Sequence, residues 1–167
     1  MTIRTSNPRP LWPAMIMGAL GLWLGGSVVL DCVVMPSLYQ AGMMTQPGFA
    51  VAGYQVFSAF NHLELCLAAL VLSGVLALLQ DRRRGLWVGL AALGLLAIAL
   101  VYAYGLTPAM AGLGLDLHWV EADAGRPAAM DWLHGSYFSL EVLKISVGLV
   151  LIKWLATVPQ PSPASPH

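Results

Sequence analysis

The stretch "VFSAFNHLELCLAAL", residues 56–70, begins a long apolar segment that continues to Leu79. Within its first turns it places an amide, an imidazole and a carboxylate, those of Asn61, His62 and Glu64. A helix of about 20 apolar residues crosses the hydrocarbon core of a membrane. The stretch therefore predicts a transmembrane helix that carries polar groups close to one end.

The whole chain has the composition of a membrane protein. Of its 167 residues, 58% are hydrophobic and 10% are charged, whereas soluble domains have about 25% charged residues. Four stretches are long enough to span a bilayer, and each must be helical because unpaired backbone groups are not tolerated in lipid. The predicted spans are Leu11 to Met35, Phe57 to Leu79, Leu86 to Leu106 and Trp132 to Leu155.

These spans predict one all-α integral membrane domain of four transmembrane helices over residues 11–156. We expect the first span to be retained as a signal anchor, because its apolar run is too long for a signal peptide. Residues 1–10 precede the domain as a cytoplasmic segment. Residues 157–167 are rich in Pro and Ser, and this composition predicts a disordered cytoplasmic tail.

The distribution of positive charge predicts the orientation. If the spans alternate in direction, most basic residues fall on one side, and Arg126 lies on the other side among acidic residues. The positive-inside rule then places both termini in the cytoplasm, and the loops 36–56 and 107–131 on the periplasmic or lumenal side. The membrane is expected to be a plasma (inner) membrane or a thylakoid. The cytoplasmic basic residues are Arg4, Arg9, Arg82, Arg83, Arg84 and Lys153.

A weak internal repeat divides the chain into two helical hairpins of the same topology. Each odd-numbered span is predicted to end at a proline, Pro36 or Pro108, because proline interrupts helical hydrogen bonding. Each even-numbered span opens with a similar mixture of residues, "FSAFNHLEL" or "MDWLHGSYF". Parallel repeats of this kind tend to form binding sites where the two repeats meet.

Polar groups in the predicted spans are concentrated in the outer half of the membrane. In the fourth span, His134, Tyr137, Glu141 and Lys144 follow one another at intervals of three and four residues. This spacing places them on one helical face. Because intramembrane charges are costly, that face must point toward other helices or water.

The second span divides its polar residues between two faces. Asn61 and Glu64 share a face, whereas His62 is rotated from Asn61 by about 100° and points elsewhere. Asp31 lies at a similar depth in the first span. The predicted outer-leaflet polar pocket is lined by Asp31, Asn61, Glu64, His134, Tyr137, Glu141 and Lys144.

Three kinds of chemistry fit this pocket. The carboxylates and the imidazole are ligand types for a divalent cation, with Asp31, Glu64, His134 and Glu141 as the candidate ligands. The same groups are typical of intramembrane proton relays. A structural network that holds the helices in register is the third alternative. The cofactor is otherwise unknown, and a haem between His62 and His134 is disfavoured by the rotation of His62.

The remaining motifs indicate no enzyme. The chain has no nucleotide-binding glycine loop, no CxxC and no HExxH motif, and nothing in it suggests nucleic acid as a partner. Cys32 and Cys66 are predicted to be buried packing residues, because Cys66 lies deeper than Cys32 and a disulfide would need them close together. We therefore expect a non-enzymatic membrane protein that binds or passes a small ligand, such as a metal ion or a proton. The alternative is an accessory or scaffold subunit of a larger membrane complex or homo-oligomer.

Four segments carry a family resemblance: "LGLWLGGSVVLDCVVMPSLY", "FSAFNHLEL", "YGLTPAMAGL" and "DWLHGSYFSLEVLKISVGLVL". Together they resemble the transmembrane protein 205-like family (domain of unknown function 4149), and "MPSLYQAGMM" is similar to its cyanobacterial branch. The resemblance covers about residues 18–155 and implies four spans, but no established activity. The matching positions are Trp23, Gly25, Gly26, Pro36, Phe57, Phe60, Asn61, Glu64, Pro108, Met110, His134, Gly135 and Ser136.

Overall fold

The computed structural model describes residues 12–43, 46, 48–79, 85–116 and 128–157. In this part of the chain all regular structure is helical. The elements are α1 (Trp12–Val29), the π-helical turn η1 (Leu30–Val34), α2 (Met35–Gln40), α3 (Phe49–Leu79), α4 (Leu86–Val101), the π-helical turn η4 (Tyr102–Leu106), α5 (Thr107–Asp116) and α6 (Ala128–Thr157). The predicted N-terminal segment 1–10 and the tail from residue 158 onward lie outside the described residues.

Three of the continuous helices are long and apolar enough to cross a membrane. They are Trp12–Gln40, Phe49–Leu79 and Leu86–Gly114, with 29, 31 and 29 residues. At 1.5 Å per residue, each is about 45 Å long, which exceeds a hydrocarbon core of about 30 Å. The fourth long helix, α6, has 30 residues and carries Asp131, Glu141, Lys144 and Lys153.

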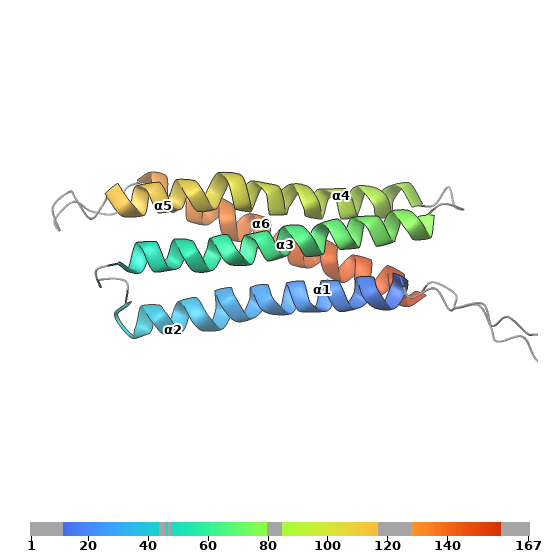
Figure 1. Ribbon diagram of the computed structural model, residues 1–167, viewed down its shortest axis with the longest axis horizontal. Helices are drawn as coiled ribbons and strands as arrows, with labels where there is room; N and C mark the ends of the chain where they lie inside the picture. Colours follow the sequence, from blue (N-terminus) through green and yellow to red (C-terminus); the bar gives the residue numbers. More distant parts are fainter. Residues whose placement is uncertain (1–11, 44–45, 47, 80–84, 117–127, 158–167) are drawn as a thin grey trace, which may run out of the picture.

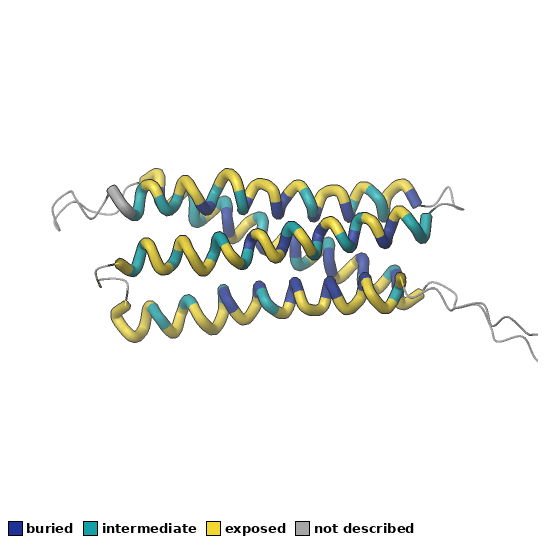
Figure 2. The backbone as a smooth tube through the Cα atoms, viewed as in Figure 1, coloured by how far each residue is buried: buried dark blue, intermediate teal, exposed yellow. Residues whose placement is uncertain are grey.

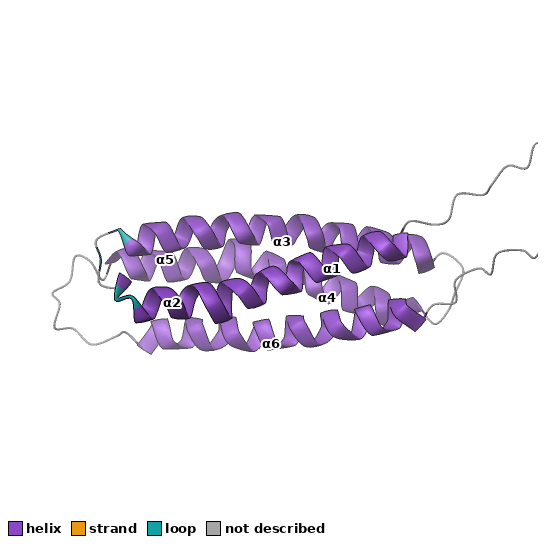
Figure 3. Ribbon diagram, turned by 90° about the horizontal axis from the view of Figure 1, so that it is seen from below, coloured by secondary structure: helices purple, strands orange, loops and turns teal. Residues whose placement is uncertain are grey.

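The long helices lie side by side and alternate in direction (Figure 1). Helix α3 packs against α1 and α4, and α6 packs against α4 and α1. The start of α1 and the end of α6 lie at the same end of the bundle, which Figure 3 shows from a second side. Each helix therefore contributes one face to a common interior.

The outer surface of the bundle is apolar. Exposed residues cover the outside of every long helix (Figure 2), and they include Leu22, Trp87 and Trp132, which are 62%, 78% and 78% exposed. A water-soluble protein rarely exposes contiguous apolar surface on this scale. The pattern is the one expected of helices that face lipid.

The interior changes character along the bundle axis. The half nearest the start of α1 holds the main apolar core, where Ile16, Leu20, Val71, Leu95 and Leu151 are buried against one another. The middle holds buried polar side chains. At the opposite end, α2 contributes no buried residue, and a cavity lies between the helices.

The two prolines do not end their helices, contrary to prediction. Helix continues past Pro36 to Gln40, and past Pro108 to Asp116. In both cases a π-helical turn precedes the proline and is separated from it by one residue; the last residues of the turns are Val34 and Leu106. The wider turn shifts the backbone hydrogen-bond pattern, and this allows the helix to accept a residue that has no N–H.

The loops of the described chain are correspondingly shorter than predicted. Helix α3 begins at Phe49 rather than Phe57, so the connection after α2 is shorter than the predicted loop 36–56. The predicted loop 107–131 likewise contains α5 and the first turn of α6.

The prediction for the two cysteines is wrong. Cys32 and Cys66, predicted to be buried, are free and exposed on the outside of the bundle.

The structure sharpens the internal repeat. The turns η1 and η4 occupy equivalent positions before Pro36 and Pro108. The interval along the chain from His62 to His134 equals the interval from Pro36 to Pro108. In each histidine, Nδ1 contacts the carbonyl oxygen of the residue four positions earlier, at 2.6 Å for His62 and 2.9 Å for His134. The two histidines therefore lie at the same distance along the chain from Pro36 and from Pro108.

Candidate functional site

The side chain of Lys144 lies at the centre of the buried polar groups. Its Nζ atom is 2.5 Å from Glu64 Oε1, 2.8 Å from Glu141 Oε2 and 2.8 Å from Ser27 Oγ. An ammonium group has three donor hydrogens, and these three acceptors use all of them. The aromatic rings of Trp23 and Tyr102 lie 5.9 Å and 5.0 Å from Nζ, within the range of a cation–π interaction.

One oxygen of Glu64 accepts three hydrogen bonds. Trp23 Nε1 donates to Glu64 Oε1 at 2.7 Å, Ser27 Oγ donates to it at 3.2 Å, and Lys144 donates to it as described. Trp23, Ser27 and Glu64 are all at most 1% exposed. Three donors on one oxygen favour the ionised carboxylate, so Glu64 is the natural counter-ion of Lys144.

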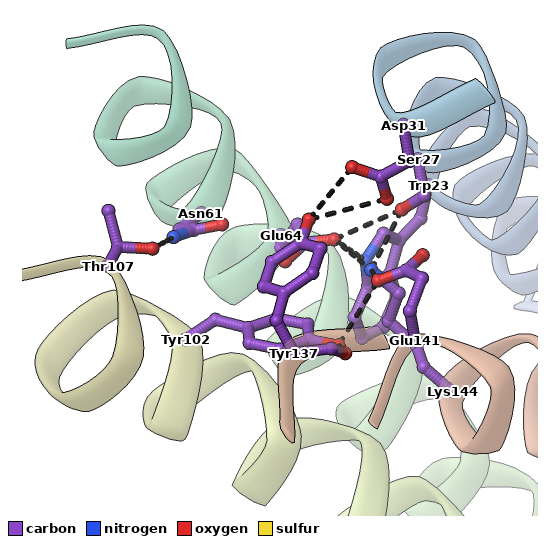
Figure 4. A network of polar contacts seen from close by, with 10 residues as sticks. All are labelled: Trp23, Ser27, Asp31, Asn61, Glu64, Tyr102, Thr107, Tyr137, Glu141 and Lys144. Atoms are coloured by element: carbon purple, nitrogen blue, oxygen red, sulfur yellow. Dashed lines mark hydrogen bonds and ion pairs between the residues drawn. The ribbon is translucent and has the colours of Figure 1, made fainter. Parts of the chain in front are cut away.

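A chain of tyrosines connects this centre to Asp31. The Tyr102 hydroxyl lies 3.1 Å from Glu141 Oε2 and from the carbonyl oxygen of Tyr137. The Tyr137 hydroxyl donates to the carboxylate of Asp31 at 3.1 Å, and the two tyrosine rings are 4.8 Å apart. Figure 4 shows these side chains pointing toward one another from several helices. We call Trp23, Ser27, Asp31, Glu64, Tyr102, Tyr137, Glu141 and Lys144 the central cluster.

The π-helical turns place two members of the cluster. Asp31 lies in η1, and Tyr102 lies in η4. A π-helical turn inserts an additional residue into the helical spacing, which rotates the side chains that follow it, and such turns are frequent at functional sites. The prolines, the turns and the cluster are therefore parts of one local arrangement.

The charges of the cluster are not balanced. In the described part of the chain, one ammonium, that of Lys144, lies among the carboxyl groups of Asp31, Glu64 and Glu141. In addition, Glu64 Oε2 and Glu141 Oε1 are buried and accept no hydrogen bond from any described residue. An uncompensated buried charge is strongly unfavourable, and it is more so in hydrocarbon.

The structure separates two of the predicted pocket residues from this cluster. Asn61 is buried and donates to Thr107 Oγ1 at 2.7 Å, which joins α3 to α5. His134 is half-buried, and its Nδ1 contacts the carbonyl oxygen of Met130. The other predicted pocket residues, Asp31, Glu64, Tyr137, Glu141 and Lys144, lie together.

Sequence reasoning missed four polar residues that the structure brings in. Trp23, Ser27 and Tyr102 contact the charged groups directly, and Thr107 is the partner of Asn61. A helical spacing of four relates Trp23, Ser27 and Asp31. This periodicity predicts that Ser27 and Asp31 share a face, and one further turn places Trp23 on the same face. Tyr102 carries no comparable signal, because the span that contains it has no charged residue to set a face.

The predicted metal ligands are not assembled for a metal ion. Among residues with described positions, no three His, Cys, Asp or Glu side chains are grouped so that they could hold one. The ammonium group of Lys144 lies between Glu64 and Glu141, at the place that a metal ion bound by both carboxylates would occupy.

The two histidines lie apart from each other. The His62 side chain is exposed and lies against Tyr104, with ring centroids 6.2 Å apart, whereas His134 lines the cavity. The structure therefore does not pair the two imidazoles.

A cavity of about 680 Å³ lies at the end of the bundle formed by α2, α5 and the first turns of α3 and α6. Asp31, Tyr137 and His134 are among the residues that line it, so the tyrosine chain leads from the cavity to Lys144. Its volume falls in the range of about 300–1,000 Å³ found for small-molecule pockets. A buried ionic cluster thus has a half-buried carboxyl group, Asp31, at the wall of a cavity.

Comparisons with other proteins identify the family but no activity. Searches of curated proteins and of solved structures gave no match. The family model described as "Domain of unknown function (DUF4149)" matches residues 18–116. These residues include Trp23, Asp31, Glu64 and Tyr102, and they extend through all three long apolar helices. Because the match covers more than half of the chain, the protein belongs to the DUF4149 family.

Proposed function

We propose that this protein is a four-span, non-enzymatic membrane protein whose central cluster binds and releases protons through the outer cavity. The observation that carries the proposal is the imbalance between one ammonium and three carboxyl groups in the bundle interior. Full ionisation of all four groups would leave a net negative charge in the interior of the bundle, which is highly unfavourable. A cluster that keeps protons on its additional carboxyl groups avoids this cost.

The geometry suggests which carboxyl groups carry the protons. Glu64 Oε1 accepts three hydrogen bonds, so Glu64 stays ionised as the partner of Lys144. Glu141 Oε2 accepts from two donors, Lys144 and the Tyr102 hydroxyl, and among the described residues Asp31 accepts from the neutral hydroxyl of Tyr137. We therefore place the exchangeable protons on Glu141 and Asp31, with Asp31 closest to the cavity.

The orientation and the fourth span form part of the same proposal. Helix α6 is as long as the apolar helices, and its exposed residues Phe138, Val142 and Leu149 suit a lipid-facing surface. Its charged groups Glu141 and Lys144 are buried against the other helices. With α6 as a span, the positive-inside rule keeps both termini in the cytoplasm and directs the cavity to the periplasmic or lumenal side. The finer resemblance to the transmembrane protein 205-like and cyanobacterial branch agrees with this arrangement.

The indole of Trp23 provides the test, because it contacts both Glu64 and Lys144. In a variant that retains only this tryptophan, with Phe at the other tryptophan positions, its fluorescence should change with pH as the cluster takes up protons. The Asp31→Asn substitution should remove most of this change or shift it along the pH scale. Far-UV circular dichroism at each pH serves as the control for unfolding.

A fluorescence signal that does not depend on pH while the protein stays folded would contradict the proposal. It would favour the alternative, in which the cluster only holds the helices in register and the protein is an accessory or scaffold subunit. Affinity purification after mild solubilisation tests that alternative directly, because it predicts a stable partner or a homo-oligomer.

A further inference from the structure

The cavity combines one acidic group with an aromatic and apolar wall. Among its described lining residues, Asp31 is the acidic side chain, and no lysine or arginine is present. The wall contains several aromatic rings, including those of Tyr54, Phe57 and Tyr137, and Phe57 meets Tyr137 edge-to-face at 5.9 Å. The methionines Met35, Met110 and Met130 supply further polarizable apolar surface.

This lining favours a particular class of ligand. Aromatic faces attract cations through the negative potential of the ring, and the attraction increases where water is excluded. The carboxyl group of Asp31 adds a negative charge when it is ionised. A small hydrated metal ion would gain little from the apolar wall, and an anion would find no lysine or arginine among the described lining residues to pair with. The cavity therefore suits a cation with an aromatic or aliphatic body.

His134 is a further titratable side chain to consider in the cavity wall, and in its neutral form it adds no positive charge that would repel a cation. A carbonyl oxygen can only accept a hydrogen bond, so the contact with Met130 requires the hydrogen of His134 to be on Nδ1. In the neutral ring, Nε2 is then an acceptor. With this ring neutral, the polar groups of the wall complement a positively charged or hydrogen-bond-donating ligand.

We infer that the cavity binds monovalent organic cations with apolar bodies, and that such a cation displaces a proton from Asp31 when it binds. When the cation enters, the Asp31 carboxyl group loses its proton to water, and the ionised carboxylate then pairs with the cation. The net charge of the cavity and its ligand is unchanged by this exchange. The displacement of the proton rests on the proposed function, whereas the binding of the cation does not.

The experiment compares two probes of nearly the same size and shape but opposite charge. Tetraphenylphosphonium and tetraphenylborate are titrated into the full chain in nanodiscs of zwitterionic lipid, and empty nanodiscs provide the baseline for partitioning into lipid. The wild-type protein should bind the cation and show no saturable binding of the anion. Calorimetry in buffers of different ionisation enthalpy should show release of a proton for each cation bound.

Two sets of variants test the residues. Asp31→Asn should weaken binding of tetraphenylphosphonium about tenfold or more, because it removes the charge partner. Tyr54→Leu should weaken it roughly two- to fivefold through loss of a cation–π contact. Tyr104→Leu is the matched control, because Tyr104 is exposed and does not line the cavity, and it should leave the affinity unchanged.

The outcomes separate this inference from the proposed function. Equal saturable binding of both probes, or equal effects of Tyr54→Leu and Tyr104→Leu, would overturn the cation site even if Asp31→Asn failed to fold. Absence of cation binding together with a pH-dependent Trp23 signal would overturn the cation site alone. Cation binding without proton release would support the site and count against proton exchange at Asp31.

Discussion

Lys144 Nζ lies 2.5 Å from Glu64 Oε1, and this contact joins α6 to α3 in the interior of the bundle. Both side chains are 1% exposed. Glu64 lies within the part of the chain that matches the DUF4149 family, whereas Lys144 lies beyond it. The ion pair therefore attaches the helix outside the match to the three apolar helices within it.

Replacement of Lys144 tests how strongly the cluster depends on its only ammonium. Lys144→Met leaves Glu64 and Glu141 without a counter-charge, and loss of one partner of a buried pair costs about 3–5 kcal/mol. We expect a large decrease in thermal stability in detergent micelles, measured by intrinsic fluorescence. Lys153→Met on the same helix is the control, because Lys153 is exposed. Equal stability of the two variants would show that the ion pair is not needed for folding.

The Asn61–Thr107 hydrogen bond should be measurable separately from the cluster. A double-mutant cycle with Asn61→Ala and Thr107→Ala should give a coupling free energy of about 0.5–1.5 kcal/mol, as for other hydrogen bonds between membrane helices. The free energy of unfolding in mixed micelles is the quantity to measure. Additive single-variant effects would contradict the contact between α3 and α5.

Close packing of α1 against α3 predicts a strong difference between two glycines. A Cβ atom at Gly74 would lie 2.6 Å from the side chain of buried Ile16, whereas one at Gly94 would have no neighbour within 4 Å. Gly74→Leu should therefore lower the free energy of unfolding by about 1–3 kcal/mol. Gly94→Leu should leave it unchanged or raise it, because glycine is a poor helix former. The reverse order of stability would show that α1 and α3 are not packed as described.

The topology can be tested with single cysteines after Cys32 and Cys66 are replaced by Ser. Gln46 lies between α2 and α3, and Thr157 is the last residue of α6. If α6 spans the membrane, a maleimide that cannot cross the bilayer should label Gln46→Cys in intact cells. It should label Thr157→Cys only after permeabilisation. Labelling of both positions from outside would mean that α6 does not cross.

Periodicity predicted part of the site because it fixes which residues share a helical face. It brought Tyr137, Glu141 and Lys144 together correctly, and it separated Glu64 from His62. It could not show that His134 belongs to the cavity instead, because a shared face says nothing about depth. The ten residues from His134 to Lys144 correspond to about 15 Å along the helix axis.

The contacts between different helices depend on how each helix is rotated about its axis relative to its neighbours. The periodicity of one segment does not determine that rotation. Tyr102 reaches Glu141 from an otherwise apolar helix, and the turn η4 contributes to its direction. The prolines predict helix ends, because proline usually interrupts helices. The helices continue past the prolines because π-helical turns precede them. No residue type in the sequence predicts such a turn.

Infrared spectroscopy of the protein at neutral pH measures whether the carboxyl groups of the buried cluster hold protons. Carboxylic acid groups absorb separately from carboxylates, and isotope labelling of Asp and Glu assigns their bands. We predict protonated carboxyl bands that disappear in part with Asp31→Asn and in part with Glu141→Gln, and that persist with Glu64→Gln. Detection of only carboxylate bands from these residues in the folded protein would contradict the account.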